Sequence, residues 1–268
     1  MGIVERNCVK ESGSGTQPMV FAHGFGCDQN MWRYVAPAFE DDYRVILFDY
    51  VGAGCSAVGA WQAERYSSLD GYAQDILDIC DALDLRDVIL IGHSVSSMIG
   101  VLAANREPDR FERLIMVGPS PRYINDADYV GGFERGDIEG LLEMMDKNFI
   151  GWANFLAPAI MKNPDRPELG AELTESFCST DPVIARRFAE ATFFADNRED
   201  LARVTVPSLI LQCTEDMIAP DQVGEYVHER TPGSTLRLLR ATGHCPHMSH
   251  PEETIAAIRE YLQPAYAG

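Results

Sequence analysis

The stretch that decides the fold is VILIGHSVS at residues 88–96, followed by the apolar segment SMIGVLA at 97–103. Residues 88–91 predict a buried strand, and 97–103 predicts a helix that starts almost directly after it. So sharp a turn raises the hydroxyl of Ser94 above the end of a sheet, beside the free N–H groups of the new helix. Gly92 is the small neighbour that the turn requires, whereas Ser96 replaces the second glycine of the G-x-S-x-G pattern. The alternative is an ordinary serine N-cap.

Two later segments carry the partners that such a serine would need. A predicted strand at 208–212 leads into Glu215 and Asp216, and one at 235–239 leads into His244. We take Asp216 as the acid and Glu215 as the second choice, although either carboxylate could instead cap the next helix. His244 is the expected base. The order Ser, Asp, His at the ends of strands predicts a nucleophilic triad in an open α/β sheet.

The predicted strand at 18–23 runs into HGFGCDQ at 23–29, where two glycines permit a tight turn. In a fold of this kind, that loop provides one oxyanion N–H and the residue after the nucleophile provides the other. We assign these groups to Phe25 and Val95. The alternative is a glycine-rich turn without a catalytic role, and the spacing matches neither phosphate-binding glycine motif.

Histidines also recur at 244, 247 and 250, which suggests a metal site. The loop contains Pro246 and Pro251, however, and lacks an acidic ligand. We therefore predict no metal and no cofactor. His247 and His250 are expected to hydrogen-bond the loop around His244. Of the remaining histidines, His93 is expected to lie under the elbow and His228 on a helix surface.

The rest of the chain alternates apolar strands with helical patterns, which predicts a mostly parallel sheet with helices on both faces. The expected strands are 18–23, 44–49, 88–91, 114–117, 208–212 and 235–239, and one helix covers 69–83. The alternation stops in the insertion 123–201, which predicts a helical lid with helices at 136–149, 151–161, 167–178 and 182–194. The core then comprises 1–122 and 202–268.

The composition restricts the partners and the compartment. With 268 residues, 46% hydrophobic, the chain can form one large domain. A formal net charge of −19 disfavours nucleic acid and anionic membranes as partners. Charged residues interrupt every apolar run, and the start lacks a secretory pattern, so we expect a soluble, cytoplasmic protein.

The cysteines stand at 8, 27, 55, 80, 178, 213 and 245, without a C-x-x-C pair. This pattern favours a reducing compartment. We expect most of them to be small buried hydrophobes. Cys27 and Cys245 flank the motifs above, but neither is the expected nucleophile.

Together these motifs resemble the α/β-hydrolase superfamily over nearly the whole chain. The segments 23–29, 45–52, 69–75 and 243–251 look like the RsbQ-type bacterial regulators of sigma-B stress signalling, and the plant strigolactone and karrikin receptors are similar. The resemblance places Ser94, Asp216 and His244 on the triad and Phe25 and Val95 on the oxyanion positions. The run GHSVSSMIG at 92–100 resembles the elbow of the plant receptors, so Ser96 is a family variant.

Large apolar side chains concentrate where the lid of that family lines a pocket, although lid core is the alternative for each of them. The expected lining residues are Phe133, Trp152, Phe155, Leu156, Phe193 and Phe194. Leu156 stands where the plant receptors usually have Phe, which argues against a strigolactone-type ligand. An apolar pocket favours a small ester, lactone or other acyl compound.

Two functions are compatible with these observations. The first is a serine hydrolase, which we expect to be monomeric and to have an RsbQ-like role in stress signalling. The second is a ligand sensor whose lid engages a partner protein, with slow or incidental hydrolysis. The resemblance implies a phosphatase-like partner.

Overall fold

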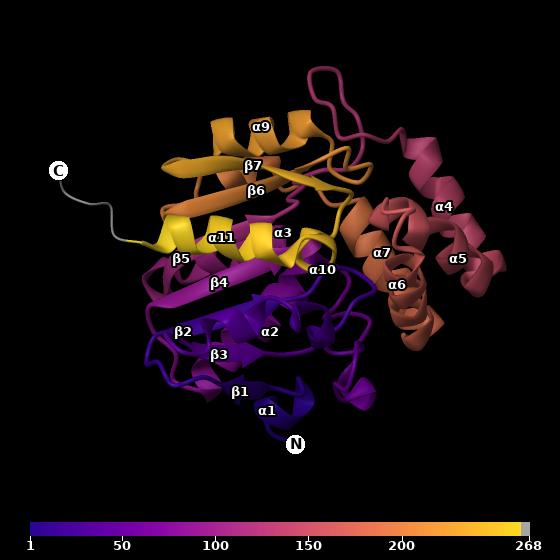
Figure 1. Ribbon diagram of the computed structural model, residues 1–268. Helices are drawn as coiled ribbons and strands as arrows, with labels where there is room; N and C mark the ends of the chain where they lie inside the picture. Colours follow the sequence, from indigo (N-terminus) through magenta and orange to yellow (C-terminus); the bar gives the residue numbers. More distant parts are fainter. Residues whose placement is uncertain (264–268) are drawn as a thin grey trace.

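The computed structural model describes residues 1–263 and contains a seven-stranded sheet in the order β1-β3-β2-β4-β5-β6-β7 (Figure 1). Every neighbouring pair is parallel except β1 with β3. The predicted α/β class is therefore confirmed. The strands are β1 (Lys10–Ser12), β2 (Pro18–Ala22), β3 (Arg44–Leu47), β4 (Val88–His93), β5 (Phe111–Val117), β6 (Ser208–Thr214) and β7 (Ser234–Thr242).

Helices connect these strands. Apart from the four long helices of the insertion, they are α1 (Ile3–Arg6), α2 (Leu69–Ala82), α3 (Val95–Arg106), α8 (Arg198–Leu201), α9 (Asp221–Arg230), α10 (Pro246–Ser249) and α11 (Pro251–Leu262). Short 3₁₀ turns are η1 (Gln29–Trp32), η2 (Ala36–Phe39), η3 (Val58–Ala60) and η4 (Pro108–Arg110). Within residues 1–263, no helix combines the length and the apolar character that crossing a bilayer demands.

Alternate residues of the central strands point to opposite faces of the sheet, and both faces are buried. On β2, Val20 packs into the cluster that contains side chains of α2, α3 and α9. Its neighbour Phe21 packs into the second cluster, with Trp32, Phe39 and Ile258. Because helices cover both faces, β2 and β4 are buried along their whole length, which explains their uninterrupted apolar sequence.

The strand β1 was not predicted. It is short, and all of its residues are exposed. It pairs with β3 in antiparallel register at one edge of the sheet. Lys10, Glu11 and Ser12 carry neither the apolar run of a buried strand nor an alternating pattern, so periodicity gives no signal for this edge.

Four helices lie between β5 and β6, in the segment predicted to be a lid, and we keep that name for them: α4 (Arg135–Lys147), α5 (Phe149–Met161), α6 (Pro167–Ser179) and α7 (Pro182–Phe193). These helices lie together beside one end of the strands (Figure 1). Their bounds agree with the helices expected in the insertion to within two residues. Pro167 and Pro182 occupy the first turns of α6 and α7, where the missing N–H costs no helical hydrogen bond.

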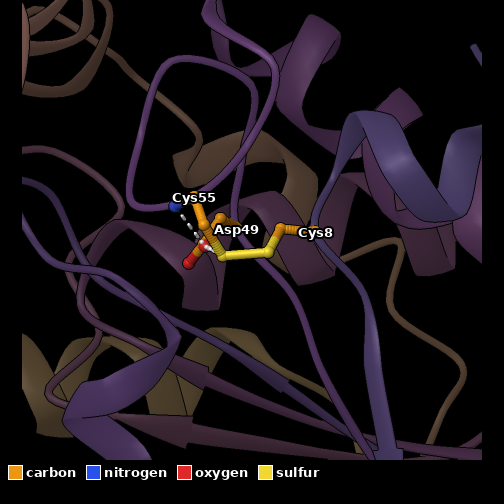
Figure 2. Close-up of side chains that lie close together, drawn as sticks. All are labelled: Cys8, Asp49 and Cys55. Atoms are coloured by element: carbon orange, nitrogen blue, oxygen red, sulfur yellow. Dashed lines mark hydrogen bonds between the residues drawn. A yellow bond between two sulfur atoms is a disulfide. The ribbon is translucent and has the colours of Figure 1, made fainter.

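The structure corrects the expectation that most of the cysteines are separate, buried side chains. Cys8 and Cys55 form a disulfide that joins the segment after α1 to the loop after β3 (Figure 2). Cys178 is exposed, whereas Cys80 and Cys213 are buried as expected. A pair 47 residues apart gives no local sequence signal, and the chain fold alone brings the two sulfur atoms together.

Removing this disulfide is expected to lower the free energy of unfolding by about 4 kcal/mol, because the loop that it closes in the unfolded chain is long. Urea unfolding of Cys55→Ser against wild type measures the difference. Cys178→Ser, at an exposed free cysteine, is the matched control and should be neutral. Equal unfolding midpoints for all three proteins would contradict a stabilising disulfide.

Candidate active site

Ser94 lies at the turn between β4 and α3 with φ 56° and ψ −122°, a strained conformation for a residue other than glycine. Its Oγ donates to His244 Nε2 over 2.7 Å. The opposite ring nitrogen, Nδ1, donates to Asp216 Oδ2 over 2.6 Å. All three residues are buried. The structure thus brings together the three residues expected to form the triad, each from a loop that follows a strand.

The choice between Asp216 and Glu215 is clear from their contacts. Besides its bond to His244, Asp216 accepts from the backbone N–H of Ile218 (2.8 Å) and Ala219 (3.1 Å) through Oδ1. The carboxylate therefore both caps the following turn and orients the histidine. Glu215 points away to Lys162 on the lid, 2.6 Å from its Nζ. This hydrogen bond and the nearby positive charge lower the pKa of Glu215.

Two residues that were not assigned to the site hold His244 in place. The Nε2–H of His93 donates to the carbonyl of His244 over 2.8 Å, and burial holds the pKa of His93 well below its usual value. Gly118, after β5, has φ 61°, and a Cβ there would lie 3.1 Å from His244 Cε1. Any side chain would therefore crowd the imidazole.

Ser96 explains the departure from the usual elbow pattern. Its buried hydroxyl donates to the carbonyl of His23 over 2.5 Å and accepts from the hydroxyl of Tyr50 over 2.9 Å. A Cβ on Gly92 would lie 2.5 Å from the carbonyl oxygen of Ser96, so glycine is required at that position. The serine thus links the elbow to the loop after β2.

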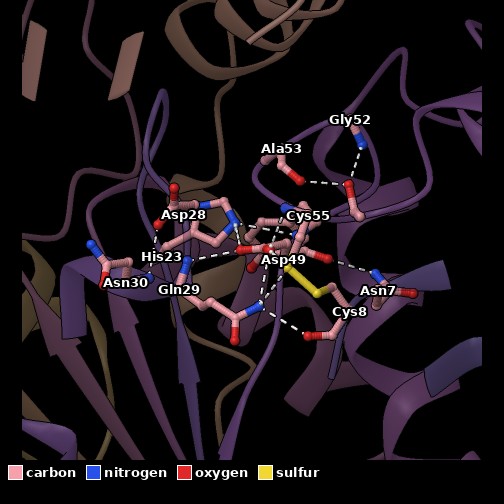
Figure 3. The surroundings of a disulfide bond; sticks show 12 residues. Asn7, Cys8, His23, Asp28, Gln29, Asn30, Asp49, Gly52, Ala53 and Cys55 are labelled. Carbon is pink, nitrogen blue, oxygen red and sulfur yellow. Dashed lines mark hydrogen bonds and ion pairs between the residues drawn. A yellow bond between two sulfur atoms is a disulfide. The ribbon is translucent and has the colours of Figure 1, made fainter. Parts of the chain in front are cut away.

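That loop carries Phe25, and the first residue of α3 is Val95. Within residues 1–263, neither backbone N–H donates to a protein acceptor. Buried Asp49 anchors the far end of the loop, because it accepts from Gln29 N (2.8 Å) and Gln29 Nε2 (2.9 Å). Figure 3 shows that this anchor lies beside the Cys8–Cys55 disulfide, and Gln29 Nε2 also donates to the carbonyl of Cys8.

A narrow cavity lies between Ser94 and the lid, which we call the triad cavity. Its apolar walls consist of Phe25, Ile160, Leu173, Phe177, Phe193 and Ile218. Tyr123 also lines it; burial raises the pKa of its phenol, and the Ser94 hydroxyl opposes that rise. Burial likewise raises the pKa of the lining thiols Cys27 and Cys245, so both remain protonated and poor nucleophiles.

Of the expected lining residues, only Phe193 contacts the cavity. Phe155 is 61% exposed, and Phe194 is 37% exposed with its ring beside Arg135. Phe133, Trp152 and Leu156 are buried in the lid core instead. On α5, adjacent residues point about 100° apart, so burial of Leu156 in the lid core turns Phe155 toward solvent.

The cost of removing Trp152 tests this placement. Its ring packs against Phe25, Phe149 and Phe177. Trp152→Ala is therefore expected to lower stability by about 3 to 5 kcal/mol, as for a buried aromatic residue. Thermal unfolding measures the loss, and Phe155→Ala on the same helix is the matched control, expected within about 0.5 kcal/mol of wild type. Equal melting temperatures for both variants would contradict the assignment of Trp152 to the lid core.

The other histidines have separate surroundings. His250 Nδ1 bonds Ser249 Oγ, and half-buried His228 bonds Ser234 Oγ. The expectation for His247 was wrong: neither ring nitrogen has a hydrogen-bond partner within residues 1–263, and the ring packs on Trp32. Burial lowers the pKa of His247 to about 3.

Among the described residues, the one group with metal-ligand spacing is Cys8, Asp49 and Cys55. In this group the two sulfur atoms are bonded to each other (Figure 2), so they offer no thiolate pair.

This fold and site define an α/β hydrolase architecture, and the comparisons agree. The model of the alpha/beta hydrolase family matches residues 19–257. The chain therefore belongs to the alpha/beta hydrolase family. A solved hydrolase from Oleispira antarctica is similar at 47% identity and a TM-score of 0.96, with 98% of this chain and 97% of that chain covered.

Two plant relatives confirm the resemblance to receptors. A karrikin insensitive 2 receptor of Petunia hybrida is 39% identical over 98% of both chains. A strigolactone esterase of Arabidopsis thaliana is 36% identical over 97% of both chains. The relatives thus include proteins named as receptors and proteins named as esterases.

Proposed function

We propose that this protein is a serine hydrolase of small, uncharged esters or lactones. The observation that carries the proposal is the continuous hydrogen-bonded chain from Ser94 through His244 to Asp216. His244 removes the proton of Ser94 as Oγ attacks the carbonyl carbon, and the resulting imidazolium donates the proton to the leaving oxygen. Water then attacks the acyl-enzyme, with His244 again as the base.

The N–H groups of Phe25 and Val95 stabilise the tetrahedral oxyanion in both steps. They are available for this role because neither donates within the described chain. The substrate class follows from the apolar walls of the triad cavity and from the net charge of −19, since both disfavour an anionic metabolite.

Intact-protein mass spectrometry after treatment with a serine-reactive fluorophosphonate tests the proposal. Wild type should gain one phosphonyl adduct, and peptide mapping should place it on Ser94. Ser94→Ala should gain none at the same reagent concentration. Unlabelled wild type is then screened with small esters and lactones, and the phosphonylated protein is the inactive control. Failure to label Ser94 would contradict the proposed nucleophile.

A ligand sensor is the second candidate, because close relatives are named as receptors. Exposed apolar side chains on the lid favour it, since Ile150 on α5 and Val183 on α7 are 64% and 65% exposed and could contact a partner. An RsbQ-like role with a phosphatase-like partner, a monomeric state and a cytoplasmic location remain proposals drawn from the sequence.

The two candidates differ in what Ser94→Ala does. A sensor that needs only occupancy would still be stabilised by its ligand after this change, and the ligand would alter protease cleavage of the lid. A pure hydrolase would show neither a change in lid cleavage nor slow turnover of the ligand by wild type. Limited proteolysis of Ser94→Ala with each lactone that wild type hydrolyses, together with the wild-type turnover rate, separates these outcomes, and thermal shift confirms that the lactone binds.

A further inference from the structure

Thr192 brings a buried hydroxyl from the lid to the triad cavity. It lies in the last turn of α7, lines the cavity and is 1% exposed. Its Oγ1 has no hydrogen-bond partner within the described chain. A helical threonine commonly bonds a carbonyl one turn earlier, and a buried hydroxyl without any partner destabilises the fold. This unsatisfied group therefore calls for a functional explanation.

The other polar side chains of the cavity belong to the triad or lie beside it. Ser94 and His244 bond each other, and His93 holds the carbonyl of His244. Tyr123 lies beside the Ser94 hydroxyl. Among the described residues that line the cavity, Thr192 has the one buried side-chain hydroxyl without a hydrogen-bond partner. It also comes from the lid, whereas Ser94 comes from the core.

We propose that the Thr192 hydroxyl binds an oxygen atom of the substrate other than that of the scissile carbonyl. Preferred substrates are then small esters or lactones that carry a second oxygen function, such as an ether or a ketone. Such a molecule spans the cavity, with its reacting carbonyl at the core and its second oxygen at the lid. This inference rests on the proposed hydrolase function and specifies its substrate class.

Matched aryl esters provide the test. The reference probe is 4-nitrophenyl pentanoate, and the oxygenated probes are the ethoxyacetate, 3-methoxypropanoate and 4-oxopentanoate esters. Each probe is measured with wild type and with Thr192→Val, which keeps the side-chain shape but lacks the hydroxyl. Dividing each kcat/KM by that for pentanoate and comparing the two proteins cancels the intrinsic reactivity of the ester.

We expect Thr192→Val to lower this ratio about three- to tenfold for at least one oxygenated ester, as for one lost hydrogen bond. The pentanoate value of each variant serves only as the divisor of the ratio. Thr192→Ser, which keeps a hydroxyl at this position, should give the wild-type ratio. Unchanged ratios for all oxygenated esters, or an equal loss for every ester, would overturn the inference.

Two further measurements separate this inference from the proposed function. Fluorophosphonate labelling of Ser94 in wild type tests the hydrolase function without an oxygenated substrate. Absence of labelling in wild type would contradict the hydrolase proposal itself. Thr192→Val should also raise Tm by roughly 2–4 °C, because it removes an unsatisfied buried hydroxyl. A lower Tm would show that the hydroxyl has a structural partner and would overturn the inference.

Discussion

Ser94→Ala is expected to lower kcat for ester hydrolysis by about a million-fold, because a triad acts as a unit and its nucleophile is irreplaceable. His244 Nε2, which accepts from Ser94 Oγ, loses the proton that it would transfer. The cavity thiols do not substitute, since burial keeps Cys27 and Cys245 protonated. Burst and steady-state release of 4-nitrophenol from a reactive ester measure the loss.

Controls separate lost chemistry from lost structure. His244→Ala should match Ser94→Ala in kcat, and both should keep a cooperative thermal transition. Cys178→Ser, at an exposed site, should behave as wild type. A chelator should not change the wild-type rate, because every proposed step uses protein groups. Turnover near the wild-type rate by pure Ser94→Ala would eliminate this mechanism.

The elements that carry the triad could be predicted because their signals are local. Each catalytic residue follows a short apolar strand, and parallel strands bring their carboxyl ends to one edge of the sheet. Knowing that Ser94, Asp216 and His244 follow β4, β6 and β7 was therefore enough to expect their proximity. The observed distances of 2.6 and 2.7 Å agree with that expectation.

The lining of the cavity could not be predicted in the same way. The helix α5 is apolar on almost every face, so its sequence does not choose which face turns inward. Leu156 is buried, whereas its neighbour Phe155 is exposed. The packing of α5 against α4 and α6 makes that choice. Thr192 was missed for a related reason, since a single hydroxyl in an amphipathic helix gives no sequence signal.

Contacts between segments far apart in the chain also could not be predicted from the sequence. The disulfide, the edge strand β1 and the bond from Ser96 to His23 join segments far apart in the chain. The hydrogen bond of Ser96 is informative, because the residue that departs from the G-x-S-x-G pattern makes a structural contact. A glycine at that position would lack the hydroxyl that links the elbow to the loop after β2.

Asp216→Asn is expected to lower kcat by about 10⁴-fold without unfolding the protein. The carboxylate accepts the Nδ1–H of His244 and so leaves Nε2 free to accept from Ser94. An amide can present its NH₂ group to Nδ1, which favours the tautomer with the proton on Nε2. That imidazole cannot take the serine proton, and a neutral amide no longer stabilises the imidazolium.

Glu215→Gln is the matched control, because it makes the same chemical change one residue away. Its side chain pairs with Lys162 rather than with the histidine, and it is exposed, so its loss should change kcat less than about twofold. Asp216 Oδ1 accepts two backbone N–H groups, which an amide oxygen can still accept. The Tm of Asp216→Asn should therefore fall by only a few degrees. If Glu215→Gln were the slower enzyme, the acid of the triad would be Glu215, and the 2.6 Å contact of Asp216 would be structural only.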